Sequence, residues 1–541
     1  MKKTCFLFAA ALLALSFAGC SWFSDDDDDN SSGTTTNTTT SSISAQDVEN
    51  VDGDYTISGT TYSVSGETVT TSSGATSAVS AVSQTKISFT IMNSDGISVT
   101  ITIDSSGNIT YTISGITYSG TIASDGNGIA TLTSSSGSTI SVAKATGSTI
   151  NAYLKSLGAD STATSVKPSA TAPSSSVTSY IIVPAVNAIA YQSGTTIYYY
   201  AAGYTDSGKK IPLPADCSEM FLGCTSLTYI DMSGFDSSNV TNMSWMFGQD
   251  LIDYDGTPVL AYIDLDGFDT SSATNMAGMF REFAGTTLDV SNFDTRNVTK
   301  MNGMFKYGYN LTTITGVENF DTSNVVKFDR MFMQCESITS LDLREYDTSK
   351  ATTMNRMFAG CKALSSLDVS SFDTSNVTDM CRMFNNCQSL SALDVGNFNT
   401  SKVSDMNRMF YGVKSITSLD VSNFNTSNVT DMGGMFAHCE AMKTLDISSF
   451  NVSKVTNTQF SWEDSGTTYY GGMFNNCLKL ETIKVKSGTD WGASGISDSI
   501  MFQYCYALTG GSGTGYDETH IDATYAKVDG GTSSPGYFTA K

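Results

Sequence analysis

The sequence predicts an α/β repeat solenoid of parallel strands and short helices, preceded by a small all-β domain. One observation is a Met-Phe pair that returns at a fixed spacing through the C-terminal two thirds of the 541-residue chain. A second is the alternation of apolar and polar residues in the N-terminal third, clearest from Lys86 to Thr102. A repeat of this kind is typical of stacked units, because one unit alone cannot bury both of its apolar edges.

The Met-Phe pair divides the C-terminal region into eleven copies of one unit. Five copies follow each other at a spacing of 26 residues, and their methionines are Met331, Met357, Met383, Met409 and Met435. The other copies are spaced less regularly, at Met220, Met246, Met279, Met304, Met473 and Met501. We therefore expect a repeat array over 220–510. We expect caps at 179–219 and 511–541, because the end units would otherwise expose a strand edge.

One unit, residues 364–387, illustrates the expected local structure. Leu364, Leu367 and Val369 have spacings that suit a short strand. The polar stretch from Asp373 to Asn376 is typical of a turn that caps a helix, because short polar side chains bond to nearby backbone groups. A short helix is expected next, since four apolar residues fall on one helical face: Val377, Met380, Met383 and Phe384.

Three stretches resemble a known family: LDVSNFNTSNVTDMGGMFAHC (Leu419 to Cys439), TIYYYAAGYTDSGKKIPLPADCSEMF and the ending KVDGGTSSPGYFTAK. The chain resembles the BspA-like bacterial surface proteins. It is more closely similar to their branch with 26-residue repeats, which also occurs in mycoplasma surface lipoproteins. The resemblance covers residues 196–541. It implies a leucine-rich-repeat-like fold and, in general terms, adhesion to host matrix proteins or to other cells.

The first 46 residues are expected to carry the chain to the cell envelope and anchor it there. Residues 1–20 combine two lysines with an apolar run, which is typical of a signal peptide. The end of this segment resembles a bacterial lipobox, so Cys20 is expected to be lipidated and to hold the protein on a membrane. An ordinary secretory signal is the alternative. Residues 21–46, with a run of aspartates and many Ser and Thr, predict a disordered tether.

Residues 47–157 are predicted to form a small all-β sandwich or barrel. Alternating segments are separated there by turn sequences at short intervals, and the stretch from Asn93 to Gly96 is the clearest hairpin turn. Residues 158–178 are rich in Ser, Thr, Ala and Pro and are predicted to be a linker.

One aspartate returns at the same strand position of successive units, and we call this set the aspartate column. In a parallel sheet its side chains would lie on one exposed face about 5 Å apart, where like charges repel. Two interpretations remain open. Water and neighbouring hydroxyls solvate the carboxylates, or the face binds a basic partner or divalent cations. The column consists of Asp231, Asp264, Asp289, Asp342, Asp368, Asp394, Asp420 and Asp446, of which the last five are our candidates for ligand binding.

Two further positions recur. The turn column alternates between Asp and Asn, so a shared acceptor for backbone N–H groups, rather than charge, is expected to matter. It consists of Asp236, Asp269, Asp294, Asp321, Asp347, Asp373, Asn399, Asn425 and Asn451. Seven cysteines also share one position and are expected to be buried thiols, with disulfides between adjacent coils as the alternative. They are Cys224, Cys335, Cys361, Cys387, Cys439, Cys477 and Cys505.

Two units exceed the period, and the extra residues are expected in surface loops. One insertion spans Asp250 to Tyr262. The other, at 458–470, places the candidates Trp462, Tyr469 and Tyr470 beside acidic residues. This loop is either a contact patch or a tolerated surface insertion.

Charge and composition narrow the function classes. A formal net charge of −24 disfavours nucleic acid as a partner, because phosphates need Lys and Arg to neutralise them. With two histidines and no nucleophile or phosphate-binding motif, we expect no enzyme, no catalytic residue, no metal and no cofactor. The sequence predicts a surface lipoprotein that binds a macromolecule, such as a host matrix or cell-surface protein, through an extended repeat face. A spacer without a ligand and a glycan-binding module are the alternatives.

Overall fold

The computed structural model of the protein describes strands between residues 53 and 144, and then residues 146–541 apart from 175, 184–185, 187, 252–256 and 465–466. Two compact units are present: Met1–Met220 with Gly234–Val240, and Phe221–Ser233 with Thr241–Lys541. Cys20 and the predicted tether lie outside the described residues. Within the part that the structure describes, no helix is both long and apolar enough to cross a bilayer.

The first unit contains an antiparallel sheet in the order β4-β3-β2-β1-β11-β10-β9-β8-β7-β6-β5. β6 pairs with β7 from Lys86–Asp104 to Met92–Ser98, as the alternating pattern predicts. A sandwich or barrel over 47–157 as a separate domain stays a prediction. The strands are β1 Gly53–Ile57, β2 Thr60–Ser65, β3 Thr68–Thr71, β4 Thr76–Ala78, β5 Ala81–Ser83, β6 Lys86–Met92, β7 Ser98–Asp104, β8 Asn108–Ile113, β9 Ile116–Thr121, β10 Ile129–Ser134 and β11 Thr139–Lys144.

Helix α3 (Gly147–Ser156) follows the sheet, within a stretch that the sequence predicted to be all β. Thr146 caps it, because the Thr146 side chain accepts the N–H of Thr149 while the Thr149 side chain accepts the N–H of Thr146. Ile150 and Leu154, four residues apart, are buried. The local cap and the helical spacing of these two residues explain why this segment does not continue the strands.

The predicted linker at 158–178 needs correction, because strand β12 (Ser165–Pro168) lies inside it. β12 pairs in parallel with β15 (Thr196–Tyr200), and Val166 is buried. β15 pairs antiparallel with β14, and β14 with β13. The other elements of this unit are β13 Ser179–Val183, β14 Ala188–Ser193, the 3-10 helix η2 Thr205–Ser207, β16 Ile211–Pro212 and β18 Phe235–Asp236. Pairing with a strand some thirty residues away, rather than local composition, orders this segment.

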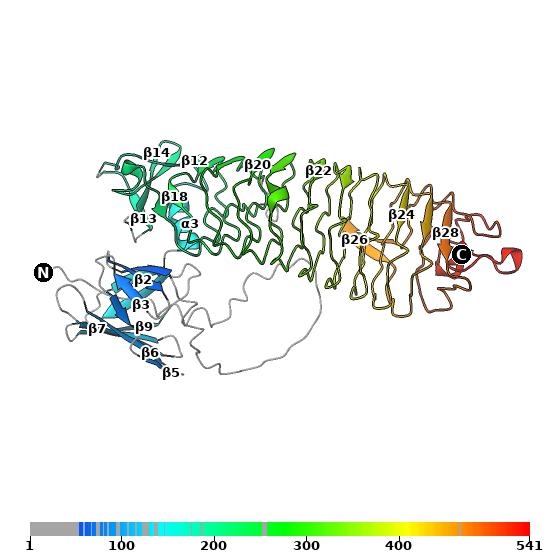
Figure 1. Ribbon diagram of the computed structural model, residues 1–541, viewed down its shortest axis with the longest axis horizontal. Coiled ribbons are helices and arrows are strands. Elements are labelled where there is room, and N and C mark those ends of the chain that lie inside the picture. The colour runs from blue at the N-terminus through cyan, green and yellow to red at the C-terminus, as the bar shows by residue number, and fades with distance from the viewer. Residues whose placement is uncertain are drawn as a thin grey trace. The chain divides into compact units, whose positions relative to one another are not determined.

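In the second unit, short strands from successive coils pair in parallel one repeat apart, and the coils follow one another in chain order from β20 to β28 (Figure 1). The strands are β17 Tyr229–Asp231, β19 Tyr262–Asp264, β20 Thr287–Asp289, β21 Thr313–Thr315, β22 Ser340–Leu341, β23 Ser366–Leu367, β24 Ser418–Asp420, β25 Thr444–Asp446, β26 Phe460–Asp464, β27 Thr467–Gly471, β28 Thr482–Val485 and β29 Phe538–Ala540. The 3-10 helices are η4 Val317–Asn319, η5 Ala523–Tyr525 and η6 Gly531–Ser533. The parallel pairing fits the predicted repeat solenoid.

The short helix expected in each coil is wrong for the Met-Phe segments that the structure describes, which form hydrogen-bonded turns instead. In one coil, Arg382 and Asn386 have φ of 56° and 57°, which an α-helix excludes. Alternate N–H groups leave the coil: Arg382 donates to the Asn407 carbonyl (2.8 Å) and Phe384 to the Met409 carbonyl (3.0 Å). The backbone therefore bonds to the next coil where a helix would bond to itself.

The buried side chains inside the coils repeat with the same period as the sequence. The phenylalanines of the Met-Phe pairs stack in one column with ring centroids 5.5 to 6.0 Å apart, namely Phe221, Phe247, Phe280, Phe305, Phe332, Phe358, Phe384, Phe410, Phe436, Phe474 and Phe502. The repeat cysteines beside them are buried free thiols, as predicted. Cys387 Sγ, for example, donates to the Phe358 carbonyl of the preceding coil (3.2 Å). Identical side chains in successive coils thus form the core.

Candidate interaction surface

The aspartate column lies along the side of the coils that the short parallel strands form, which we call the strand edge. In the parallel register Asp231 stands beside Asp264, and Asp420 beside Asp446. The column is not continuous, because the neighbours of Asp289 and Asp446 on the other side are Thr315 and Lys484. Of the five predicted binding residues, Asp342, Asp368, Asp394 and Asp420 are exposed, and Asp446 is half-buried.

Each of these carboxylates is held by its own chain. One oxygen of Asp368, Asp394 and Asp420 accepts the N–H two residues later at 2.9 Å. The hydrogen bond from Ser370 holds the pKa of Asp368 below its usual value, and Ser422 does the same for Asp420. Asp368 and Asp420 are therefore ionised at neutral pH, and the hydrogen bonds fix the orientation of all three carboxylates.

Two members of the column are neutralised from within the chain. Arg344 lies 2.6 Å from Asp342 and lowers the pKa of that carboxyl to about 2. The Lys541 ammonium lies 2.7 Å from Asp446. The negative surface is consequently strongest where such a partner is absent, and this makes the members of the column unequal as binding residues.

The turn column has the structural role predicted for it. In coil after coil its carboxylate or amide oxygen accepts the N–H two residues on, as in Asp373 to Ser375 (2.8 Å) and Asn425 to Ser427 (3.1 Å). Since Asp and Asn make the same bond, charge is not what this position needs. We therefore confirm the turn column as a backbone support and do not count it as binding surface.

The insertion at 458–470 forms a hairpin of β26 and β27, in which Trp462 pairs with Tyr469 and Ser461 with Tyr470. Tyr470 is 58% exposed, whereas the side chains of Trp462 and Tyr469 lie outside the described ones. The hairpin base is fixed by Arg408, which donates to the Ser461 carbonyl (2.6 Å) and lies 4.5 Å from the Phe460 ring. This contact is with a Met-Phe segment, so the hairpin and the aspartate column are separate parts of the surface.

Sequence reasoning missed a cleft on the strand edge, which we call the tyrosine cleft. It has a volume of about 370 Å³ and lies where β19 and β20 belong to different sheets. Apolar residues, among them Phe283, form part of its lining. The other part is Tyr262 and a set of polar side chains: Asp264, Asp266, Thr287, Asp289, Ser291 and Asn292. The tyrosine that replaces Ser or Thr at this strand position, and the extra aspartate two residues after Asp264, were the available signals.

Sequence reasoning also missed an exposed aromatic cluster near the C-terminus. Tyr504 and Tyr506 are 44% and 55% exposed, with ring centroids 6.1 Å apart. The Tyr516 ring meets that of Tyr506 edge to face at 5.6 Å. Exposed tyrosine faces of this kind are surfaces on which a ligand can stack.

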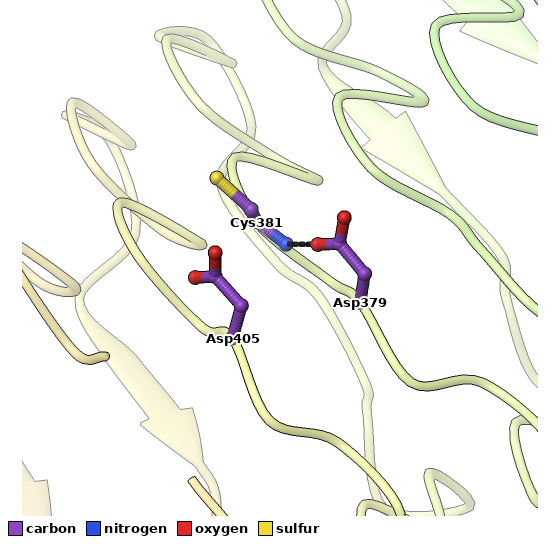
Figure 2. A group of neighbouring side chains, drawn as sticks. All are labelled: Asp379, Cys381 and Asp405. Atoms are coloured by element: carbon purple, nitrogen blue, oxygen red, sulfur yellow. Dashed lines mark hydrogen bonds between the residues drawn. The ribbon is translucent and has the colours of Figure 1, made fainter. Parts of the chain in front are cut away.

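Figure 2 shows the one group among the described residues whose atoms could converge on a metal: Asp379, Cys381 and Asp405, from adjacent coils. Their possible ligand atoms lie within 4.8 Å of one another. Asp379, however, already accepts the Cys381 N–H (2.8 Å) and the Asn355 side-chain amide (2.9 Å). Burial raises the pKa of the Cys381 thiol to about 12, whereas a metal needs the thiolate. We interpret the group as a polar support between coils. The sequence did not indicate this role, because a short helix was expected for this segment.

Comparison with known proteins finds one family. The model described as "Mycoplasma protein of unknown function, DUF285" matches residues 215–314, 254–366, 307–418, 391–482 and 420–514. These overlapping matches cover more than half of the chain and coincide with the repeated coils. No curated protein matches the sequence, and no solved structure matches it.

Proposed function

The chain belongs to the repeat family described as a Mycoplasma protein of unknown function, DUF285, and we propose that it is a surface-anchored solenoid that binds other macromolecules. The proposal names protein–protein interaction or adhesion as the function, with a host matrix protein or a protein of another cell as the partner. The resemblance to BspA-like lipoproteins, with leucine-rich-repeat-like coils, belongs to this proposal.

The observation that carries the proposal is the row of exposed aspartates held at fixed geometry along the strand edge. One oxygen of each is bonded within its own turn, so little conformational entropy remains to be lost when a partner binds. Acidic groups repeated coil after coil suit a partner with an extended basic surface. Many weak contacts and long-range electrostatic steering would contribute to its binding.

Anchoring is the second part of the proposal. Cys20 would carry the lipid, residues 21–46 would act as a spacer, and the coils would then face the outside of the cell envelope. We expect that radiolabelled fatty acid is incorporated into the protein in its host and that Cys20→Ala abolishes the label. Unchanged labelling of the Cys20→Ala variant would contradict lipidation at this residue.

A glycan-binding module is the second candidate, favoured by the exposed rings of Tyr470, Tyr504 and Tyr506. Sugars stack on such rings, and binding would then depend on the aromatic residues and not on the aspartates. A spacer without a ligand remains the structural alternative.

The test is binding of the full-length, detergent-solubilised protein to a panel of matrix proteins and glycans by surface plasmon resonance. One variant changes Asp342, Asp368, Asp394, Asp420 and Asp446 to Asn. Its matched control changes five members of the turn column to Asn, namely Asp269, Asp294, Asp321, Asp347 and Asp373. Three other coils already carry Asn at this position. Both variants lose the same charge, and both keep the turn.

We expect saturable protein binding that weakens with salt and is reduced in the first variant alone. A third variant changes Tyr470, Tyr504 and Tyr506 to Ala. If this variant alone loses binding, the result would instead support the glycan module. If a cooperatively folded protein binds no member of the panel, the spacer interpretation replaces the proposal.

A further inference from the structure

The tyrosine cleft gathers several uncompensated negative charges at one place on the strand edge. Three carboxylates line it, those of Asp264, Asp266 and Asp289, and its lining contains no Lys or Arg. None of the three forms an ion pair within the described residues, unlike Asp342 and Asp446 with their cations. The described part of the chain therefore supplies no positive group that balances the carboxylates of the cleft.

The carboxylates of the cleft are oriented before any ligand arrives. Asp264 accepts the N–H of Asp266 (3.0 Å), and Asp289 accepts the N–H of Ser291 (2.9 Å). The side-chain amide of Asn292 also ties the two coils together, because it donates to the carbonyls of Leu265 (3.1 Å) and Phe268 (2.9 Å). The cleft is thus held open between two coils by bonds that a ligand would not have to break.

One wall of the cleft is aromatic. Tyr262 is 56% exposed and stacks on Tyr229 with ring centroids 5.2 Å apart and planes 5° apart. Most other coils carry Ser or Thr at the position of Tyr262, for example Ser366 and Ser418. A ring fixed by stacking beside carboxylates can contact a cation through its face, which is worth about 0.5–1 kcal/mol at an exposed site.

The chemistry of the cleft selects among ligands. A divalent metal needs converging oxygens, but among the described residues three ligand atoms approach within 4.8 Å of one another only around Asp379, Cys381 and Asp405. A neutral sugar would leave the charge of the three carboxylates unpaired. An ammonium or guanidinium group on an apolar stem matches both the carboxylates and the tyrosine face. The volume of about 370 Å³ suits one such side chain with part of its backbone.

We propose that the tyrosine cleft binds a lysine or arginine side chain of a basic protein partner, with the cationic group between Asp264 and Asp289 and against Tyr262. This inference rests on the proposed function, since it assigns that partner a chemical class and gives it a contact point. It predicts one anchoring site in an otherwise diffuse acidic face.

The test uses the full-length protein in detergent and fluorescein-labelled octalysine, followed by fluorescence anisotropy at about 20 and about 150 mM salt. A Gly-Ser peptide of equal length gives the baseline. We expect Asp264→Asn with Asp289→Asn to raise the Kd about tenfold, which corresponds to about 1.4 kcal/mol. Tyr262→Ala should raise the Kd about threefold, and Tyr262→Phe should leave it unchanged, because the ring and not the hydroxyl makes the contact.

The matched control is Asp347→Asn with Asp373→Asn in the turn column, which is not part of the binding surface. Each of these exposed residues accepts the N–H two residues later and forms no ion pair within the described residues, and neither lines the cleft. Their double variant should change the Kd less than twofold. Equal losses in both double variants, or no binding of octalysine to the wild type, would overturn the inference.

The two proposals fail in different ways. If Asp264→Asn with Asp289→Asn leaves binding to a matrix protein and to octalysine unchanged, the cleft inference is wrong while the general binding function stands. If octalysine binds in the cleft but no macromolecule of the panel binds, the cleft inference holds at the level of chemistry and the proposed function fails. Melting curves of each variant show whether it is folded.

Discussion

At the residue scale, environment separates aspartates that look equivalent in the sequence. Asp420 is exposed on the strand edge, and the hydrogen bond from Ser422 lowers its pKa. Asp405, on the neighbouring ladder between Asp379 and Asp431, is partly buried, and burial first and then these two carboxylates raise its pKa to about 6. The same residue type therefore stabilises the fold at one position and destabilises it at the other at neutral pH.

Asp405 gives a pH-dependent prediction. Its pKa is near 3.9 in the unfolded chain and about 6 in the fold, so its stabilising contribution is complete below about pH 3.9 and is lost as the pH rises through about 6. Asp405→Asn keeps an oxygen to accept the Asn407 N–H (2.7 Å). We expect this variant to raise the free energy of unfolding by about 1–2 kcal/mol at pH 8 and by less at pH 5, as measured by urea denaturation.

The control for Asp405 has the opposite sign. The pKa of Asp420 is lowered in the fold, so its contribution is present above its unfolded pKa and is lost on acidification. Asp420→Asn should therefore reduce stability at pH 8. An Asp405→Asn variant that is less stable than the wild type at pH 8 would contradict the assignment of Asp405 as a half-buried, unfavourable carboxylate.

At the scale of the element, neighbouring coils are joined by buried hydroxyls as well as by strands. A buried threonine in each coil donates to the turn-column carbonyl of the next: Thr270, Thr295, Thr322, Thr348, Thr374, Thr400 and Thr426. Thr374 also accepts the N–H of Asn399 at 2.7 Å. Each coil thus provides both partners that the next coil's turn requires.

This ladder predicts a difference between two conservative changes. Thr374→Val keeps the shape but removes the acceptor of the part-buried hydrogen bond from the Asn399 N–H, which should cost about 1–3 kcal/mol of unfolding free energy. Thr374→Ser keeps the hydroxyl and loses one methyl group, at about 0.8 kcal/mol. Chemical denaturation should give the Thr374→Val variant a lower free energy of unfolding than the Thr374→Ser variant. The reverse ranking would show that packing and not hydrogen bonding governs this position.

The phenylalanine column gives a second prediction for the element. Phe384 is fully buried between Phe358 and Phe410, each 5.7 Å away. Phe384→Ala should lower the free energy of unfolding by about 3–5 kcal/mol, because it opens a cavity that the coils on either side cannot close. Phe384→Leu, which fills most of the space, should cost less than about 1.5 kcal/mol. Similar losses for both would rule out the cavity explanation.

At the scale of the whole molecule, a stack of coils is stable only if its last coil is covered. β29 pairs in parallel with β28, and Tyr537 and Phe538 are fully buried. The Phe538 ring also meets Trp491 edge to face at 5.2 Å. The C-terminal cap predicted at 511–541 thus includes a strand that occupies the edge of β28.

Removing residues 511–541 should therefore expose that edge. We expect a lower melting temperature and concentration-dependent self-association, because an open parallel edge and an uncovered aromatic core favour pairing between molecules. Light scattering after size-exclusion chromatography measures this, and Thr539→Ser, which keeps the strand, is the control. A monomeric, equally stable truncated protein would show that the coils need no cap.

The sequence alone determined the period, the parallel stacking of like residues, the burial of the repeat cysteines and the turn column. These follow from interactions within a few residues or from exact repetition, so one coil predicts the next. Only the tertiary structure decided that the Met-Phe segments are turns, that β12 orders the predicted linker and that Asp405 is half-buried while Asp420 is exposed. It also decided that a cleft opens beside Tyr262. Each of these depends on which backbone group bonds across coils or to a distant strand, and local sequence does not encode that choice.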